Sequence, residues 1–281
     1  MHTTKCEDTP IAVVTGAGAG LGRALTLELS RRGIVVVGLG RNLPDLETTV
    51  GLASGATVVP RCVDVSDNKA VVATFASIRE RLGDPTILIN NAAVHPRCDF
   101  LGCSPEEFMS CVAINLGGAV NCAHAALFSM SQTGRGRIVN IGSFADISPQ
   151  PMAGAYSVSK GAVRIFSRAL VADLGDRFPD IVISTWMPGI LATRMGLASG
   201  LDPAAAARWG VELALCNDRE LNGAVFERDL QIAENQSFKR RLLEKILRRS
   251  APLRRLVPET AEASGQAQAW QMTERQAGPV S

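Results

Sequence analysis

The sequence is poor in aromatic and histidine side chains and has almost no net charge. Aromatic residues make up 5% of the 281 positions, with a single tyrosine, and there are three histidines. Lysine and arginine nearly balance aspartate and glutamate, which leaves a formal net charge of +2. This balance gives no electrostatic reason to expect a nucleic-acid partner. Three scattered histidines also give no basis for a metal site, so we expect no bound metal.

Long apolar runs and paired cysteines are lacking as well. No apolar run reaches the ~18 to 20 residues that span a bilayer, so we expect no transmembrane segment. The first residues, MHTTKCEDTPIAVVTG, contain no basic segment followed by an apolar one, and they predict no secretion signal. The seven cysteines are odd in number and have no metal-ligand spacing. We therefore expect free thiols and a cytoplasmic location.

What is present is an alternation of short β-branched runs with longer helical stretches. Nearly continuous apolar strands separated by helices indicate a parallel sheet covered on both faces. Right-handed crossovers then give a doubly wound, Rossmann-like α/β fold of about seven strands. We expect one domain over residues 10–230, after an N-terminal tail of residues 1–9. The expected strands are residues 11–15, 34–40, 56–65, 86–90, 136–143, 181–189 and 223–228.

The segment TGAGAGLG, residues 15–22, joins the first expected strand to the first expected helix. Its glycines permit a tight turn and a close approach of the backbone to a phosphate, and the start of the helix offers free N–H groups. The alternative is a flexible glycine–alanine turn. We expect a dinucleotide phosphate here, bound by Gly16, Ala19, Gly20, Leu21 and Gly22.

The end of the second strand should meet the adenosine ribose, where an acidic residue would favour NAD(H). This chain instead has Gly40, Arg41 and Asn42, and the Arg41 guanidinium suits a 2′-phosphate. We therefore expect NADP(H) rather than NAD(H), although Arg41 can also be an ordinary solvated arginine. Asp64 and the adjacent Val65 are placed to meet the adenine, and Asp64 can equally be a turn or capping residue.

Several polar features converge on the carboxyl edge of the expected sheet. They are NNAA (90–93), Asn115, Ser143 at the end of a strand, YSVSK (156–160) at the start of a helix, and PGILAT (188–193). Together with TGAGAGLG they resemble the short-chain dehydrogenase/reductase family, over residues 10 to about 228. Two departures are NNAA where the family usually has NNAG, and Trp186 just before MPG; neither touches a reacting group.

The resemblance implies hydride transfer between a nicotinamide cofactor and a carbonyl or alcohol, with Tyr156 as general acid and base. A tyrosine pKa near ~10 is too high for a base at neutral pH, and a nearby Lys160 ammonium would lower it. By the same resemblance, Lys160 binds the nicotinamide ribose, Ser143 hydrogen-bonds the substrate oxygen, and Asn115 holds a water. We expect the three residues between Tyr156 and Lys160 to face elsewhere and tolerate change. The remaining expected cofactor contacts are Asn91, Ala92, Pro188, Gly189, Ile190 and Thr193.

The substrate pocket is expected to be mostly apolar, which favours a hydrophobic or mixed ketone. Arg97 in the loop after the fourth strand is a candidate ligand for an acidic substrate or a carrier phosphopantetheine, but a solvated loop arginine is the preferred interpretation. The expected pocket residues are His95, Phe144, Ala145, Met152 and Met195.

The end of the chain differs in composition from the rest. Residues 231–257 contain a basic amphipathic segment, SFKRRLLEKILRRSAPLRRLV, which predicts a helical extension. Packing on its own or a neighbouring subunit is the preferred role, with an acidic carrier protein or an anionic membrane surface as alternatives. Residues 258–281 are polar and rich in small residues, and we expect them to be disordered.

Three functions agree with these features. The leading one is an NADP(H)-dependent oxidoreductase that interconverts a ketone or aldehyde and an alcohol. The second is a reductase of carrier-bound β-keto acyl or polyketide intermediates, with an acyl-carrier partner. The third is a non-catalytic NADP(H)-binding sensor or scaffold. The resemblance also implies a homodimer through the helices near 104–131 and 155–177, or a homotetramer.

Overall fold

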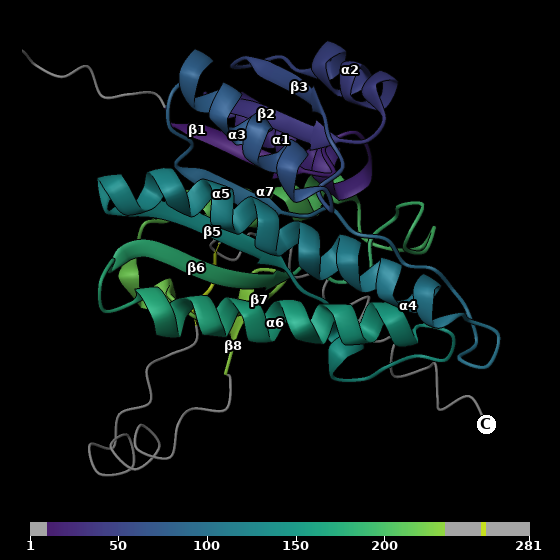
Figure 1. The fold of residues 1–281 in the computed structure, drawn as a ribbon. Helices are drawn as coiled ribbons and strands as arrows, with labels where there is room; N and C mark the ends of the chain where they lie inside the picture. The colour runs from purple at the N-terminus through teal and green to yellow at the C-terminus, as the bar shows by residue number, and fades with distance from the viewer. Residues whose placement is uncertain (1–9, 234–253, 257–281) are drawn as a thin grey trace, which may run out of the picture.

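Eight strands form one sheet in the order β3-β2-β1-β4-β5-β6-β7-β8 (Figure 1). The structure is a computed structural model, and it describes residues 10–233 and 254–256. All neighbours from β3 to β7 are parallel, and β8 is antiparallel to β7. The strands are β1 (Ile11–Thr15), β2 (Val35–Gly40), β3 (Val58–Cys62), β4 (Ile87–Asn90), β5 (Arg135–Ile141), β6 (Asp180–Met187), β7 (Val225–Glu227) and β8 (Leu230–Ile232).

The expected doubly wound fold is confirmed, with one strand more than the seven expected. The strand order reverses between β1 and β4, which places a crevice at the carboxyl ends of these two strands. The additional strand, β8, follows β7 after a turn in which Arg228 takes a positive φ of 53°. Its three residues are only half-buried and show no alternation, so the sequence carries too little signal to predict it.

Three helices cover each face of the sheet. Leucines of α1 (Gly20–Arg31) pack with α2 (Leu43–Leu52) and α7 (Pro203–Leu215) into one core layer. On the other face, α3 (Asn68–Arg81), α5 (Gly118–Thr133) and α6 (Gly154–Leu174) form the second layer. In Figure 1 this second layer lies in front of the sheet. Burial of large side chains such as Phe75 and Trp186, both 0% exposed, stabilises the two layers by ~2 to 3 kcal/mol per residue.

The long helix along this second face begins at α4 (Pro105–Val112) and continues into α5 through a π-helical turn, η1 (Ala113–Gly117). Its start carries a capping box, in which the Ser104 and Glu107 side chains each accept from the other residue's backbone N–H. Residues Pro105–Thr133 form one helix that is long and apolar enough to cross a membrane by length and composition. This is weak evidence for a span, because a core helix passes the same test and α5 packs its alanines on the sheet.

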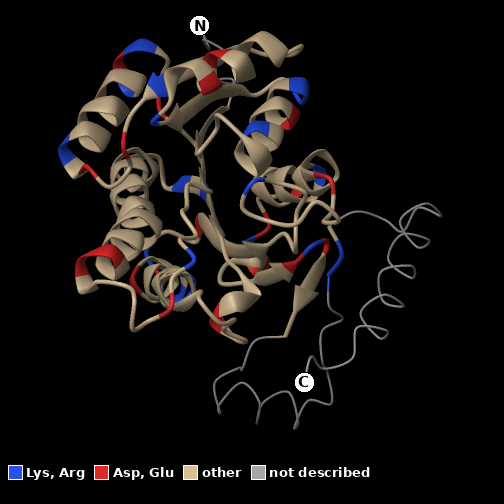
Figure 2. Cartoon of the chain, turned by 90° about the vertical axis from the view of Figure 1, so that its right-hand side faces the viewer, with Lys and Arg blue, Asp and Glu red and all other residues tan. Residues whose placement is uncertain are grey.

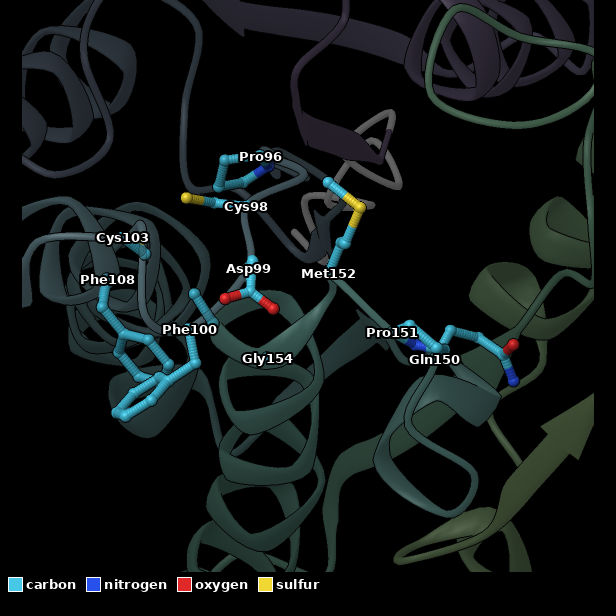
Figure 3. Close-up of a pocket in the computed structure, with 11 residues that line it drawn as sticks. Pro96, Cys98, Asp99, Phe100, Cys103, Phe108, Gln150, Pro151, Met152 and Gly154 are labelled. Atoms are coloured by element: carbon cyan, nitrogen blue, oxygen red, sulfur yellow. The ribbon is translucent and has the colours of Figure 1, made fainter.

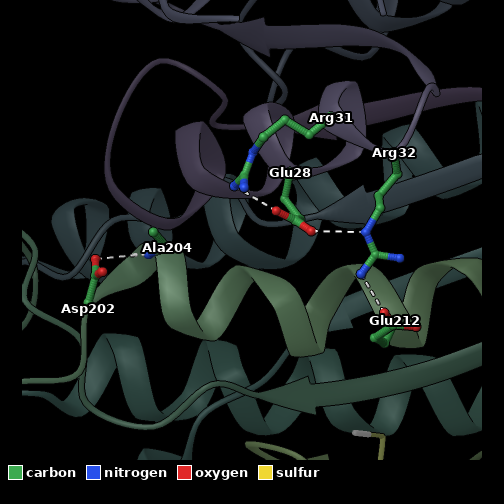
Figure 4. A network of polar contacts seen from close by, with 6 residues as sticks. All are labelled: Glu28, Arg31, Arg32, Asp202, Ala204 and Glu212. Atoms are coloured by element: carbon green, nitrogen blue, oxygen red, sulfur yellow. Dashed lines mark hydrogen bonds and ion pairs between the residues drawn. The ribbon is translucent and has the colours of Figure 1, made fainter. Parts of the chain in front are cut away.

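Positions of basic and acidic residues are interspersed around the fold (Figure 2). On the outer side, α1 and α7 are joined by ion pairs (Figure 4). Glu28 accepts from Arg31 at 2.6 Å and from Arg32 at 3.1 Å, and Arg32 also reaches Glu212 at 2.5 Å. Exposed pairs of this kind contribute about 1 kcal/mol or less each.

The described ends of the C-terminal extension are extended rather than helical. Residues 231 and 232 belong to β8, and Arg255 forms an antiparallel bridge with Leu230. Leu256 packs against the α1–α7 core layer. The expected tail at residues 1–9, the body of the basic helix and the tail at 258–281 lie outside the described residues.

Candidate active site

The glycine turn between β1 and α1 lies at the point where the strand order reverses. Gly16 and Gly20 adopt positive φ values of 69° and 51°, which side chains rarely tolerate. A Cβ on Gly22 would come within 2.0 Å of the Gly16 carbonyl oxygen. The turn therefore needs glycine at all three positions, as expected from their spacing.

No side chain of α1 itself caps the backbone N–H groups of its first turn. Ala19 is the N-cap residue and makes no side-chain capping bond, and the first turn contains no acidic residue. Leu21 is buried under the turn and anchors it. Free backbone N–H groups and the positive end of the helix dipole therefore face outward, and this arrangement suits a phosphate.

Thr15, at the end of β1, ties this turn to the segment after β4. Its hydroxyl oxygen accepts from the backbone N–H of Asn91 at 2.9 Å and of Ala92 at 2.8 Å. The Asn91 side chain donates to the Thr15 carbonyl at 2.8 Å. On the other side, a Cβ on Gly20 would lie 3.2 Å from the Thr193 methyl group. Three segments far apart in the sequence thus meet around one turn.

The adenosine side of the crevice contains Arg41, which is well exposed, and Asp64. The Arg41 guanidinium lies 3.8 Å from the Asp64 carboxylate. Asp64 also accepts from the backbone N–H and the hydroxyl of Ser66, and the Ser66 hydroxyl is the main cause of its lowered pKa. Asn42 accepts from the Asp45 N–H and caps α2. Asn42 and Asp64 therefore have local structural roles, and Arg41 is the group available to a ligand.

Val65, the last of the expected adenosine contacts, is buried rather than open to the crevice. Its side chain packs so closely against Gly118 that a Cβ there would lie 2.5 Å from a Val65 methyl group. This packing brings the segment after β3 against the start of α5.

Tyr156, Ser143 and Lys160 come together at the carboxyl end of β5. Ser143 caps the short 3-10 helix η2 (Phe144–Asp146), and its hydroxyl lies close enough to the Tyr156 phenol to lower the pKa of that group. One turn further along α6, the Lys160 ammonium lies 5.7 Å from the Tyr156 ring centroid and donates to the Ile141 carbonyl at 2.8 Å. Lys160 is 4% exposed and has no carboxylate partner within hydrogen-bond distance among the described residues.

Burial moves the pKa values of these two groups apart. It lowers the pKa of Lys160 from 10.5 to about 8, because the charged ammonium loses its hydration. It raises the pKa of the Tyr156 phenol, and the nearby Ser143 hydroxyl opposes that increase. The sequence-based interpretation considered only the lysine charge and missed the effect of burial. Two buried neighbours with perturbed pKa values at the carboxyl end of a strand mark a candidate site for proton transfer.

The π-helical turn η1 directs Asn115 toward the site. The Asn115 side-chain oxygen accepts from the Val94 N–H at 2.7 Å, and its amide donates to the Val94 carbonyl at 2.9 Å. The same amide donates to the Ser159 hydroxyl at 2.9 Å. Asn115 is 2% exposed and therefore fixes the loop after β4 against α6.

The expectation for the residues between Tyr156 and Lys160 is wrong for two of the three. Ser159 is 0% exposed, and its hydroxyl accepts from Asn115 while donating to the Tyr156 carbonyl at 2.7 Å. Ser157 is also buried, and only Val158 is exposed, at 54%. Residues three apart in a helix share a face, so the helical period itself places Ser159 near Tyr156.

Two cavities lie along the loop after β4, one lined by Ala155 next to Tyr156 in the chain and the other by His95. One, of about 260 Å³, contains Met152, Phe100 and Phe108 (Figure 3). In Figure 3 the two phenylalanines lie together on one side of the start of α6, with Pro151 and Gln150 on the other. The second cavity, of about 720 Å³, contains His95 and Met195. Phe144 and Ala145 contact neither cavity, because η2 turns away from them.

His95 makes the most direct contact with Tyr156 from the loop. The two rings are stacked, with centroids 4.2 Å apart and an interplanar angle of 24°. Burial and the nearby Arg97 charge lower the pKa of His95, which favours the neutral imidazole. The sequence predicted a pocket position for His95, but the stacking required the folded loop to be seen.

The segment after β6 forms the side of the crevice where the nicotinamide is expected. Pro188 and Gly189 follow β6 directly, and Gly189 takes a positive φ of 87° with the Arg228 side chain packed close to it. Ile190 is 47% exposed, and the following chain folds back through a hydrogen bond from Ala192 N–H to the Leu201 carbonyl at 2.8 Å. This return places Thr193 against the glycine turn.

Comparison with known proteins agrees with this geometry. The family model described as short chain dehydrogenase matches residues 10–202, well over half of the chain. The chain belongs to the short-chain dehydrogenase family. It is similar to the 3-oxoacyl-(acyl-carrier-protein) reductase FabG of Pseudomonas aeruginosa, with 32% identity over 187 residues, covering 66% of this chain and 75% of that protein. It is also similar to the short-chain reductase protein NovJ of Streptomyces niveus, with 32% identity over 189 residues, covering 66% and 70%.

A solved structure shows the same arrangement. The crystal structure of a short-chain dehydrogenase/reductase from Burkholderia xenovorans superposes with a TM-score of 0.72 at 25% identity, covering 78% of this chain and 94% of that one. As a member of this family, the short-chain dehydrogenase described here is an oxidoreductase that uses a nicotinamide cofactor. The residues present fit such a group, since the glycine turn and the uncapped α1 offer a place for its phosphates.

Proposed function

We propose that this short-chain dehydrogenase interconverts a ketone or aldehyde and the corresponding alcohol with NADP(H), and that Tyr156 is its general acid and base. The supporting observation is the arrangement at α6, where Tyr156 stacks on His95, lies near the Ser143 hydroxyl and has the buried Lys160 ammonium 5.7 Å from its ring centroid. The cofactor supplies or accepts the hydride when bound. Tyr156 gives its proton to the carbonyl oxygen in reduction and takes it from the alcohol in oxidation.

Each neighbour of Tyr156 has a separate task in this proposal. The Ser143 hydroxyl steadies the oxygen while charge develops on it. Lys160 favours the phenolate and contacts the cofactor ribose. Asn115 holds the loop after β4 and, through Ser159, the helix that carries Tyr156. A water linking Lys160 to solvent at Asn115 is part of the same proposal.

Tyr156→Phe tests this assignment. The variant keeps the ring and its stacking on His95 but lacks the hydroxyl. We expect turnover of a ketone and alcohol panel to fall by at least about a hundredfold, in line with general acid–base catalysis, while cofactor affinity stays within twofold. Unchanged turnover with intact NADPH binding would instead support the third function, a non-catalytic sensor or scaffold.

We propose NADP(H) rather than NAD(H) because Arg41, which follows β2 directly, is well exposed and has only a long, solvated ion pair with Asp64 at 3.8 Å. Arg41→Asp is expected to weaken NADPH binding by tenfold or more, because it removes a charge-assisted hydrogen bond and adds repulsion. The affinity for NADH should stay the same or increase. An unchanged ratio of the two affinities would refute the role of Arg41.

Carrier-bound β-keto acyl or polyketide substrates are the second candidate, favoured by the similarity to a 3-oxoacyl-(acyl-carrier-protein) reductase. Comparing turnover of free and carrier-bound substrate separates the two.

We also propose a homodimer or homotetramer in the cytoplasm. Large apolar side chains are exposed along the helices that would form the dimer, and monomeric light scattering across a concentration series would refute it. These exposed residues are Met109, Val120, Phe128, Val158 and Ile165.

A further inference from the structure

The 720 Å³ cavity lined by His95 is bounded by the loop after β4, the helix α4 and the segment after β6. Arg97 comes from the first of these and Arg194 from the last, and both are exposed at the cavity. The single carboxylate in its lining is Glu107. That carboxylate already accepts from the Ser104 N–H at 2.9 Å in the capping box. The cavity therefore presents more positive than negative charge.

Neither Arg97 nor Arg194 has a hydrogen bond or ion pair with any residue that the structure describes. Elsewhere in the described chain, exposed arginines commonly meet a carboxylate, as Arg219 does with Asp180 at 2.5 Å and Arg255 with Asp229 at 2.8 Å. Two guanidinium groups that converge on one cavity without such a partner are suited to bind an anion, because each offers a planar set of N–H donors.

His95 sets the distance between this charge and the reacting carbonyl. One face of its ring stacks on Tyr156 at 4.2 Å between centroids, and the Arg97 charge acts on it from the loop. The buried His95 Nε2 has no hydrogen-bond partner in the described structure. Because His95 both lines the cavity and stacks on Tyr156, a substrate that reaches the arginines and the Tyr156 hydroxyl has several bonds between its anion and its carbonyl.

We propose that this cavity binds the carboxylate of a keto acid, or of the matching hydroxy acid, through Arg97 and Arg194 while Tyr156 acts on the carbonyl or hydroxyl several bonds away. The inference rests on the proposed function, since it names the substrate class of the same site. Reduction adds a hydride to the carbonyl carbon and the Tyr156 proton to its oxygen, which yields a hydroxy acid and the oxidised cofactor.

The test uses matched pairs of acids and neutral esters in which only the charge differs. The probes are 4-oxopentanoate, 5-oxohexanoate and 6-oxoheptanoate with their methyl esters, and NADPH consumption is followed by absorbance. For at least one chain length we expect the wild type to favour the acid over its ester in kcat/KM by tenfold or more. Loss of one charged hydrogen bond corresponds to about tenfold, so Arg97→Gln and Arg194→Gln should each lower the value for that acid by about this factor.

The ester provides the internal control, because its kcat/KM should stay within twofold in Arg97→Gln, Arg194→Gln and the double variant. Arg208→Gln is the matched protein control. Arg208 is an exposed arginine on α7, on the opposite face of the sheet, and its replacement should leave both substrates unchanged.

The inference is overturned if the wild type shows equal kcat/KM for each acid and its ester. It is also overturned if the arginine variants lower kcat/KM for acid and ester by the same factor. It is also overturned if acetoacetyl-N-acetylcysteamine, a neutral thioester, is a better substrate than every acid. If no carbonyl compound is reduced, the proposed function fails, and thermal unfolding with NADP and each acid still decides the binding claim. An acid that raises the Tm of the wild type and of Arg208→Gln, but not of the double variant, supports the site. No increase in the wild type overturns it.

Discussion

Replacing Lys160 by methionine should make the protein more stable at neutral pH while removing its activity. Lys160 is 4% exposed, and burial lowers its pKa from 10.5 to about 8. A pKa that differs by about 2.5 between the unfolded and folded chain corresponds to ~3 kcal/mol, at ~1.4 kcal/mol per pKa unit. This is the cost of holding the ammonium in the folded protein below pH 8. Methionine has a similar length and no charge, so the variant avoids the cost.

The effect has a definite dependence on pH. Between pH 8 and 10.5 the unfolded chain holds a proton on Lys160 that the folded chain has released. The unfolded state binds more protons in this window, so the stability of the wild type rises with pH there. The stability of the variant lacks this contribution. The difference in free energy of unfolding between Lys160→Met and the wild type is therefore largest at pH 7, and it decreases by ~2 to 3 kcal/mol by pH 10.

One opposing contribution does not depend on pH. The ammonium donates to the Ile141 carbonyl at 2.8 Å, and loss of that bond costs about 1 kcal/mol. We therefore expect Lys160→Met to exceed the wild type by ~1 to 2 kcal/mol in free energy of unfolding at pH 7.

Urea unfolding at a fixed protein concentration, at pH 7, 8, 9 and 10, measures this difference. Lys69→Met, at an exposed position on α3, is the control and should show no such trend. A difference between Lys160→Met and the wild type that stays constant from pH 7 to 10 would refute the reasoning.

Three further variants test other contacts. Ser159→Ala removes the acceptor of the Asn115 amide, and we expect a loss of ~1 to 3 kcal/mol in urea unfolding and a fall in turnover without loss of cofactor affinity. Gly22→Ala places a methyl group 2.0 Å from the Gly16 oxygen, so calorimetric titration should show at least tenfold weaker NADPH binding. The buried Arg137 guanidinium donates to the Leu213 carbonyl, the Val182 carbonyl and the Ser184 hydroxyl. Arg137→Met removes these three bonds, so the free energy of unfolding should fall by ~3 kcal/mol or more, seen as a lower Tm. A wild-type value in any of these measurements contradicts the contact it tests.

The sequence predicts the features that depend on local patterns. Apolar strands, capping residues and the glycine spacing act over a few neighbouring positions, so β1, α1 and the start of α4 lie where expected. Helix α2 was missed, although its signals were present in Asn42 and Pro44. Asn42 had been assigned to the cofactor, and its role as an N-cap was overlooked.

Features that depend on distant segments were not predictable in the same way. The stacking of His95 on Tyr156 requires a loop to fold over a helix that follows it by about sixty positions in the sequence. Met152 adopts a positive φ of 61°, and its carbonyl accepts from the Cys98 N–H at 3.0 Å. Both contacts arise where two irregular segments meet, and no periodicity marks such places in the sequence.

The π-helical turn at Ala113–Gly117 has a consequence for the shape of the pocket. An extra residue in a helix turns everything before it by about 100° relative to everything after it. On one side of the turn, α5 presents alanines to the sheet; on the other, α4 presents Phe108 and Cys111 to the two cavities. The turn thus sets the rotational phase between the half of the helix that builds the core and the half that shapes the pocket. Deleting one residue there would leave the core face in place and rotate the pocket wall away from Tyr156.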